Sequence, residues 1–299
     1  MTVTPELKSN WRRQSLGNAL QTILLLAIMA GFLALIGGLL MGPNGILILL
    51  LGGALTVLLN PIFSPALVMR VHQARPIKRA WAPALYQILD ALGERAGLPQ
   101  TPTLYEVPEQ GVNAFAVGTP RHAAIGLTQD LIRILDWREL TSVLAHETSH
   151  IANRDVLVLG MADLFNRLTG ALSILGQMLL ILALPMILWS DVTISWAAIF
   201  LLIFAPYMSA LTQLALNRAR EYNADLNAVR LTGDPEAMIS TLIKIEQFQG
   251  GFWERVLRPG RRGKDTSSLL RTHPTMEERV NRLRALDPET LPHPIQPRR

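Results

Sequence analysis

The feature that most limits how this chain can fold is a long run without charged side chains. No Asp, Glu, Lys or Arg lies between Arg13 and Arg70. A single buried core helix cannot use a run of that length, whereas a membrane-spanning helix needs about 20 apolar residues. The turn-forming cluster Met41–Gly45 divides the run. We therefore expect two membrane helices, at roughly residues 16–41 and 46–69.

A second pair of apolar segments follows later in the chain. Residues 168–190 and 192–217 are uncharged and are separated by Asp191. Pro185 and Pro206 lie inside them, and membrane helices tolerate proline. The alternative interpretation is a very apolar, water-soluble helical protein, but four such segments rarely occur together in proteins of that kind. The sequence therefore predicts four transmembrane helices arranged as two hairpins.

The basic residues lie on one side of these predicted hairpins. The turns at 42–45 and 190–193 contain no Lys or Arg. The basic residues precede the first helix, follow the second or follow the fourth, and they are Lys8, Arg12, Arg13, Arg70, Arg75, Lys78, Arg79, Arg218 and Arg220. The positive-inside rule makes that side cytoplasmic. We expect a multi-pass protein of the plasma or inner membrane, with both termini and the polar regions in the cytoplasm. The net charge of +5 is then a topology signal, and no nucleic-acid partner is expected.

The composition excludes several other classes. Hydrophobic residues make up 49% of the 299 residues and charged residues 17%, against about 25% charged in a typical soluble domain. Global disorder is therefore excluded. The chain has no cysteine, which excludes a disulfide scaffold, a thiol protease, cysteine-ligated zinc and iron–sulfur clusters.

Two polar regions flank the second hairpin and complete the predicted domain organisation. We expect an N-terminal membrane hairpin at 1–71, a first catalytic part at 72–167, the second hairpin at 168–217 and a second catalytic part at 218–299. The fold class is mainly α with a small β-sheet. Four transmembrane helices would accompany a cytoplasmic catalytic domain.

Periodicity and turn residues predict the elements of the polar regions. Residues 82–96 read as an amphipathic helix, and 103–107, 113–117 and 123–127 read as short strands. Three further helix starts follow from capping patterns: Asp136 with Glu139, Asp234 with Pro235, and Thr275 with Glu278.

Two segments near the C-terminus lack these signals. The stretch 258–268 is rich in Gly and Arg, and we expect a mobile loop there. The proline-rich sequence after Asp287 is expected to be frayed.

The helix that begins after Asp136 contains the motif His146-Glu147-Thr148-Ser149-His150. Histidines four residues apart face the same side of a helix, so both imidazoles can bind one zinc ion. Glu147 lies beside them and can take a proton from the water that the metal activates. The alternative is a helix with two surface histidines, which leaves Glu147 without a role.

A catalytic zinc site needs a third protein ligand and one open position. The nearby run Asn153–Asp155 has no third histidine, so the ligand must come from farther along the chain. Glu221 is the best candidate, because it lies in a polar segment that returns the chain from the last predicted membrane helix. Asp225 is one turn further on the same face, where it can orient an imidazole or pair with an arginine.

Four blocks in order resemble the HtpX family of membrane zinc metalloproteases, relatives of the CAAX prenyl endoproteases. They are Asn113-Ala114-Phe115-Ala116, the zinc helix His146–Asp155, the segment Arg218–Asp225, and Thr272-His273-Pro274 with Arg279 six residues after the histidine. The resemblance spans nearly the whole chain. It implies a zincin-like catalytic domain of the gluzincin type, with one Zn²⁺ per chain.

The resemblance also implies roles that spacing does not show. Asn113–Val117 would be an edge strand along which a peptide substrate pairs, although Phe115 could equally be ordinary core packing. His273 would point into the cleft and stabilise the oxyanion. Arg279 would support Asp225 or the cleft wall. His72, His122 and His293 have no such context and are read as incidental.

The resulting hypothesis is a membrane-embedded zinc endopeptidase with His146, His150 and Glu221 as ligands and Glu147 as base. The resemblance implies misfolded or damaged membrane proteins as substrates, cleaved in their cytoplasmic segments, with the lipid bilayer as the other partner. Three alternatives stay open: a CAAX-type processing protease, a protease with zinc inside the bilayer, and a catalytically silent scaffold or sensor. The sequence leaves cleavage specificity and oligomeric state undetermined.

Overall fold

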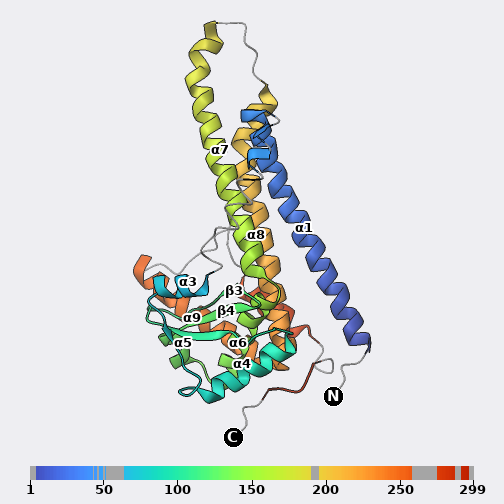
Figure 1. The fold of residues 1–299 in the computed structure, drawn as a ribbon, viewed down its shortest axis with the longest axis vertical. Helices are drawn as coiled ribbons and strands as arrows, with labels where there is room; N and C mark the ends of the chain where they lie inside the picture. Colours follow the sequence, from blue (N-terminus) through green and yellow to red (C-terminus); the bar gives the residue numbers. More distant parts are fainter. Residues whose placement is uncertain are drawn as a thin grey trace. The chain divides into compact units, whose positions relative to one another are not determined.

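The structure is a computed structural model, and it describes residues 5–42, 44–45, 47–49, 51, 64–189, 195–257, 275–286 and 291–295. The chain separates into two compact units. Unit 1 contains residues 1–60 and 158–217, and unit 2 contains residues 61–157 and 218–299. Figure 1 shows the fold, with labels on most of the elements of both units.

Unit 1 is built from the long helix α1 (Pro5–Met41), from α7 (Asp155–Trp189) beyond residue 157 and from α8 (Trp196–Thr232) up to residue 217. Within the described residues, these three helices contain segments long and apolar enough to cross a membrane. They pack through two small clusters, one around Met29, Ala162 and Leu216 and the other around Ile36, Leu202 and Ala205. Because many of their other apolar side chains are exposed, a lipid environment accounts for their composition.

The predicted turn at Met41–Gly45 is present, because α1 ends at Met41 and Gly42 has a positive φ of 66°. Most of the second expected span, 46–69, lies outside the described residues. Its last part differs from the expectation: Pro65–Val71 is a separate short helix, α3, assigned to unit 2. Met69 of α3 is buried on the sheet of unit 2, so an apolar run there reflects core packing instead of a membrane span.

Helices α7 and α8 extend beyond the segments that their uncharged runs predicted. The expected spans 168–190 and 192–217 lie within helices that begin at Asp155 and end at Thr232. Pro185 and Pro206 lie inside these helices. The unit boundaries fall at 60/61, 157/158 and 217/218, whereas charge patterning placed the first two near 71 and 167.

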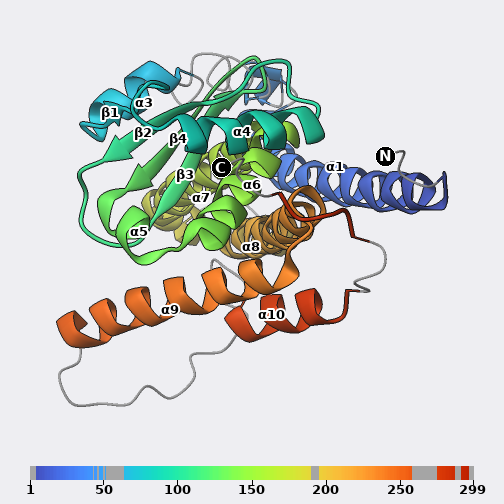
Figure 2. The ribbon, with the colours of Figure 1, turned by 90° about the horizontal axis from the view of Figure 1, so that it is seen from below.

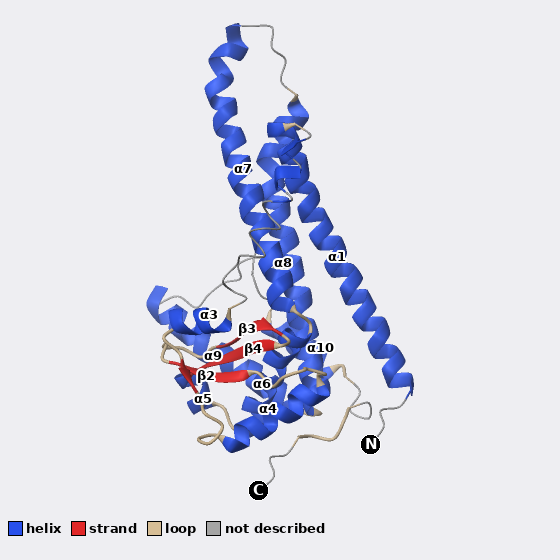
Figure 3. Ribbon diagram, viewed as in Figure 1, coloured by secondary structure: helices blue, strands red, loops and turns tan. Residues whose placement is uncertain are grey.

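Unit 2 contains a four-stranded sheet in the order β1-β2-β4-β3. Figure 3 shows β2, β4 and β3 of this sheet in that order. The strands are β1 (Arg75–Pro76), β2 (Thr103–Val107), β3 (Ala114–Thr119) and β4 (His122–Thr128). Strands β2 and β4 are parallel, and the other two pairs are antiparallel. The three predicted strands are confirmed with small changes of boundary, while β1 was not predicted.

Helices cover both faces of this sheet. On one face lie α4 (Pro83–Arg95) and α6 (Trp137–Ala152), which share the main core with Leu104, Ile125 and Leu127 of the strands. On the other face, α3 packs Met69 against Val117 and Ala124. The short helix α5 (Gln129–Ile134) follows β4. The resulting core fixes α6, which carries the predicted motif.

Helices α9 (Pro235–Leu257) and α10 (Met276–Arg284) lie side by side, and α9 also contacts α6 (Figure 2). The predicted helix starts are confirmed. Asp136 and Glu139 form a reciprocal capping box, as do Thr275 and Glu278. Asp234 accepts a hydrogen bond from Ala237 N–H at the start of α9.

The C-terminal segment contradicts one expectation. Residues 291–295 are docked on unit 2, where Leu291 and Ile295 pack against the main core. Ile295 N–H donates to Thr232 O, and Gly233, with φ of 73°, leaves room for the Pro292 carbonyl. Composition predicted fraying because proline-rich sequence forms no regular element, but proline and isoleucine can still pack against a preformed surface.

Candidate metal centre

The last turns of α6 bring two imidazoles together. The Nε2 atoms of His146 and His150 lie 3.1 Å apart, and the two rings meet edge to face. A tetrahedral ion with bonds of about 2.0–2.1 Å separates two ligand atoms by about 3.3 Å. The spacing therefore suits two ligands of one ion.

Helix α8 supplies the third group. The Glu221 carboxylate lies with Oε2 3.7 Å from His146 Nε2 and with Oε1 3.8 Å from His150 Nε2. The ligand atoms of these three residues all lie within 4.8 Å of one another. The structure thus brings together the three residues that the sequence analysis selected as ligands.

The far side of each imidazole faces a carboxylate. His146 Nδ1 lies 3.0 Å from Asp225 Oδ1, and His150 Nδ1 lies 2.7 Å from Asp155 Oδ2. A carboxylate at Nδ1 favours the tautomer that carries hydrogen there and leaves the Nε2 lone pair free. Two such lone pairs then face each other across 3.1 Å, an arrangement that a cation stabilises.

Each of these two carboxylates is paired with an arginine. Arg220 Nη1 lies 2.8 Å from Asp155 Oδ1. Arg279 donates to both oxygens of Asp225, at 2.6 and 2.5 Å. The structure therefore places Arg279 on Asp225, one of its two expected positions.

The sequence analysis assigned Asp155 and Arg220 no role at the metal centre. The available signals were an acidic residue three positions after the end of α6 and a basic residue directly before Glu221. Neither signal shows which charges meet, because Arg220 lies on α8, 65 positions after Asp155 in the chain.

When both imidazoles are counted as neutral, the described charged groups around them do not balance. The surrounding groups are four carboxylates and two guanidinium groups, all mostly buried: Glu147, Asp155, Glu221, Asp225, Arg220 and Arg279. With neutral imidazoles, this leaves an excess of two negative charges. Unbalanced buried charge is costly, so a divalent cation at the facing nitrogen atoms fits both the donor set and the charge.

Glu147 lies next to His146 on α6 and is only 7% exposed. Burial raises the pKa of its carboxyl group, while the positive charges of His150 and His146 and the Ala116 N–H oppose that effect. A carboxyl group with a raised pKa accepts and returns a proton more readily near neutral pH. This suits the role of a general base.

His150 holds a proton strongly when the metal is absent. Burial alone would lower its pKa, but the Asp155 hydrogen bond and the charges of Glu147 and Glu221 raise it to about 9. The same carboxylates that favour a metal ion therefore favour a proton in its place.

The predicted substrate strand forms the end of the sheet next to α6. Strand β3 is last in the strand order, and its Ala114 and Ala116 pack against the main core that contains α6. Asn113, just before it, is hydrogen-bonded to Thr128 through its backbone N–H and O. Phe115 points to the other face, where its ring centroid lies 5.0 Å from that of His72. Phe115 therefore has the core-packing role that was the alternative for it.

Some of the predicted positions cannot be placed. His273, Thr272 and Pro274 lie outside the described residues, as does the loop 258–268. The metal centre described above does not depend on them.

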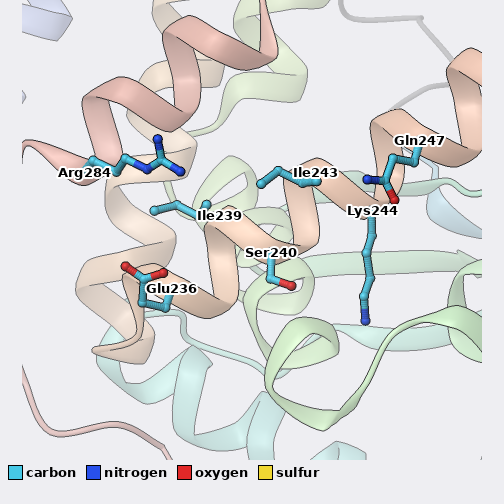
Figure 4. Close-up of a pocket in the computed structure, with 7 residues that line it drawn as sticks. All are labelled: Glu236, Ile239, Ser240, Ile243, Lys244, Gln247 and Arg284. Atoms are coloured by element: carbon cyan, nitrogen blue, oxygen red, sulfur yellow. The ribbon is translucent and has the colours of Figure 1, made fainter.

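A hollow of about 440 Å³ lies on α9, away from the metal centre (Figure 4). Six of its lining residues belong to α9 and the seventh, Arg284, to α10. Two of them, Ser240 and Lys244, reach the buried Glu139 at the start of α6 with contacts of 2.6 and 2.7 Å. This hollow therefore borders a structural ion pair and none of the predicted ligands.

Two histidines one turn apart on a helix, joined by a glutamate from a later helix, define a metallopeptidase centre of the zincin type. The sequence profile of peptidase family M48 matches residues 80–287. The chain belongs to this family.

Relatives at moderate identity extend this result to nearly the whole chain. A "Protease HtpX homolog" from Ralstonia nicotianae is 33% identical over 278 residues, covering 89% of this chain and 96% of the relative. Another from Nostoc punctiforme is 33% identical over 290 residues, covering 91% and 97%. The resemblance to the HtpX family that the four motifs indicated is confirmed.

A solved structure is similar in fold. The crystal structure of S. mikatae Ste24p superposes with a TM-score of 0.52 at 18% sequence identity, covering 94% of this chain and 67% of that chain. At this identity the likeness concerns the fold alone.

Proposed function

We propose that this protein is a membrane-integral, zinc-dependent endopeptidase of the HtpX type. One zinc ion would be held by His146, His150 and Glu221. The observation that carries the proposal is the convergence of their ligand atoms within 4.8 Å, in a buried cluster with two excess negative charges. Family membership and the names of the relatives support peptidase activity.

The mechanism follows from the residues around this centre. Zinc, when bound, would polarise the scissile carbonyl and lower the pKa of a water to about 7. Glu147 takes the proton of the attacking water and returns it to the leaving amine. Asp225 keeps the His146 imidazole oriented through its Nδ1 atom. Oxyanion stabilisation by His273 stays a prediction from the resemblance.

The position of β3 supports an extended peptide as the substrate. The Ala116 N–H reaches the Glu147 carboxylate, so a peptide added to the outer edge of β3 would pass the base. Strand addition supplies main-chain hydrogen bonds without requiring a particular sequence. This suits a protease that accepts unfolded segments, and misfolded or damaged membrane proteins are the proposed substrates.

The proposed topology has four spans, with both termini and unit 2 in the cytoplasm. The charge asymmetry of the sequence and the three apolar helices support it. Because the chain has no cysteine, single cysteines can report sidedness directly. A membrane-impermeant thiol reagent should label Ser190→Cys in intact cells and label Gln73→Cys only after lysis. The reverse pattern would contradict the orientation.

The activity is tested with the detergent-purified full chain, reconstituted with zinc and incubated with an unfolded protein. Wild type should cleave, and Glu147→Gln should lose about 10²–10⁴-fold in rate while retaining zinc. Glu139→Gln is the matched control, because it alters a buried carboxylate on the same helix and should cleave normally when folded. Cleavage by Glu147→Gln would contradict the assignment of the base.

The same experiment also tests the proposed class of substrates. Zinc binding without cleavage by wild type would contradict a broad endopeptidase and favour a narrow processing enzyme or a silent scaffold. Cleavage of unfolded but not of folded membrane proteins would support quality control.

A further inference from the structure

We propose that Asp155 and Arg220 are positioning residues that hold the His150 imidazole in the orientation required by the metal. The inference rests on the proposed zinc-dependent function and deepens it. Asp155 and Arg220 act on the centre through His150.

The Asp155 carboxylate is shared between two partners. Its Oδ2 lies 2.7 Å from His150 Nδ1, and its Oδ1 lies 2.8 Å from Arg220 Nη1. Asp155 is 1% exposed and Arg220 is 8% exposed. With one oxygen ion-paired to a buried guanidinium group, the carboxylate has little freedom to move, and the imidazole hydrogen-bonded to its other oxygen is held in one orientation.

A contribution to the stability of the fold does not by itself explain why Asp155 and Arg220 form a buried ion pair. A buried ion pair can often be replaced by apolar side chains without loss of stability, because desolvation offsets the attraction. Here the pair has a third partner, and that partner is a ligand of the proposed metal. Carboxylates at the outer nitrogen of metal-binding histidines fix the tautomer and raise the basicity of the ligand.

The backbone directly before Asp155 adopts a conformation that is unfavourable for a residue other than glycine. Arg154 has a positive φ of 56°, a region that side chains other than glycine rarely adopt. Its N–H donates to Ile151 O, which closes the end of α6. This residue changes the direction of the chain after α6, and Asp155 then lies against His150, five positions earlier. A disfavoured backbone that places a side chain against a ligand points to function.

The two imidazoles are supported by separate sets of residues. His146 is held by Asp225 and Arg279, from α8 and α10. His150 is held by the first residue of α7 and by Arg220 of α8. Since the sets share no residue, the His150 support can be removed while the His146 support stays intact.

The test measures zinc affinity of the detergent-purified full chain by competition with a chromophoric chelator. Asp155→Asn should weaken zinc binding about 10–100-fold, and Arg220→Gln should weaken it by a smaller factor. Arg220→Lys, which keeps the charge, should restore part of the affinity. The control is Glu139→Gln, a buried carboxylate on α6 that contacts no ligand, and its zinc affinity should stay within about twofold.

The outcomes separate this inference from the proposed function. If wild type binds no zinc, the proposed function fails. If wild type binds zinc and Asp155→Asn binds it within twofold of wild type, the positioning role is wrong and the metal centre stands. If Asp155→Asn does not fold, Arg220→Gln and Arg220→Lys decide: equal affinity in wild type and both variants overturns the inference.

Discussion

Helix α6 has a buried acidic group near each end, and the two ends differ in what balances the charge. Near the start, Glu139 is 2% exposed and is paired with Lys244 at 2.7 Å, Ser240 at 2.6 Å and the Asp136 N–H at 2.9 Å. Near the other end, four carboxylates meet two guanidinium groups and two imidazoles whose Nε2 atoms face each other. A buried acid matched by the protein's own donors is structural, whereas three potential ligand atoms that converge within 4.8 Å of one another form a site that a cation can occupy.

The largest expected effect comes from removing the acceptor that completes the metal end. Glu221→Gln removes the charge of one metal ligand. It should reduce zinc affinity more than the loss of a carboxylate that only contacts a ligand, for which we expect a factor of about 10–100. Proteolysis should fall below detection at equal zinc. Metal analysis of gel-filtered protein checks this, and a variant with a full complement of zinc would contradict the ligand assignment.

The pH dependence should also distinguish the metal end. Because the pKa of His150 is raised to about 9 in the metal-free protein, zinc must displace a proton at any lower pH. Affinity should therefore rise about tenfold per pH unit between pH 6.5 and 9 and level off above that. Chelator competition across this range measures it, and an affinity independent of pH would show that His150 binds no metal.

The start of α6 should respond through stability. Glu139→Gln leaves Lys244 without its partner, but Lys244 is partly exposed and can be hydrated, so we expect a loss of about 1–3 kcal/mol. Zinc content should be unchanged. The exposed pair Arg138–Asp234 is the control, because Arg138→Gln should cost within about 0.5 kcal/mol. Denaturant unfolding monitored by fluorescence gives both values.

The sign of the pH effect at Glu139 follows from its partners. Burial would raise its pKa, but Lys244, Ser240 and the Asp136 N–H together hold it below the ordinary value of 4.5. Its stabilising contribution is therefore complete above pH 4.5 and is lost as pH falls through the lowered pKa. The stability gap between wild type and Glu139→Gln should close in that range, and a gap that persists at lower pH would contradict the ion-pair account.

The smallest expected effect lies away from both ends of α6. Gly233→Ala places a Cβ against the Pro292 carbonyl at a positive φ of 73°, which should cost about 1–2 kcal/mol. Zinc affinity should not change. Faster proteolysis of the C-terminal residues 291–295 would show that the docked segment has been released, and unchanged protection would contradict the docking.

The sequence predicted best what depends on neighbours in the chain. The capping box of Asp136 and Glu139, the ligand pair His146 and His150, and the strands are local patterns, and the structure reproduces them. Glu221 was found because its segment stood out as polar after an apolar helix.

Contacts between distant segments were missed. Asp155 meets His150 only because Arg154 turns the chain, and it meets Arg220 only because α8 returns beside α6. Pro292 and Ile295 dock on a surface that composition does not reveal. Similarly, the apolar side chains of α3 looked like part of a membrane span because sheet packing and lipid select the same residues.

We propose that the C-terminal end of α6 binds a divalent metal ion, whereas the N-terminal end is neutralised by a side chain of the protein. X-ray absorption at the zinc edge, on the full chain purified with zinc, tests it most directly. We predict one zinc per chain, with nitrogen and oxygen ligands at about 2.0–2.1 Å and the outer scattering of two imidazoles. Folded protein without zinc, or zinc surrounded by oxygen alone, would contradict the account.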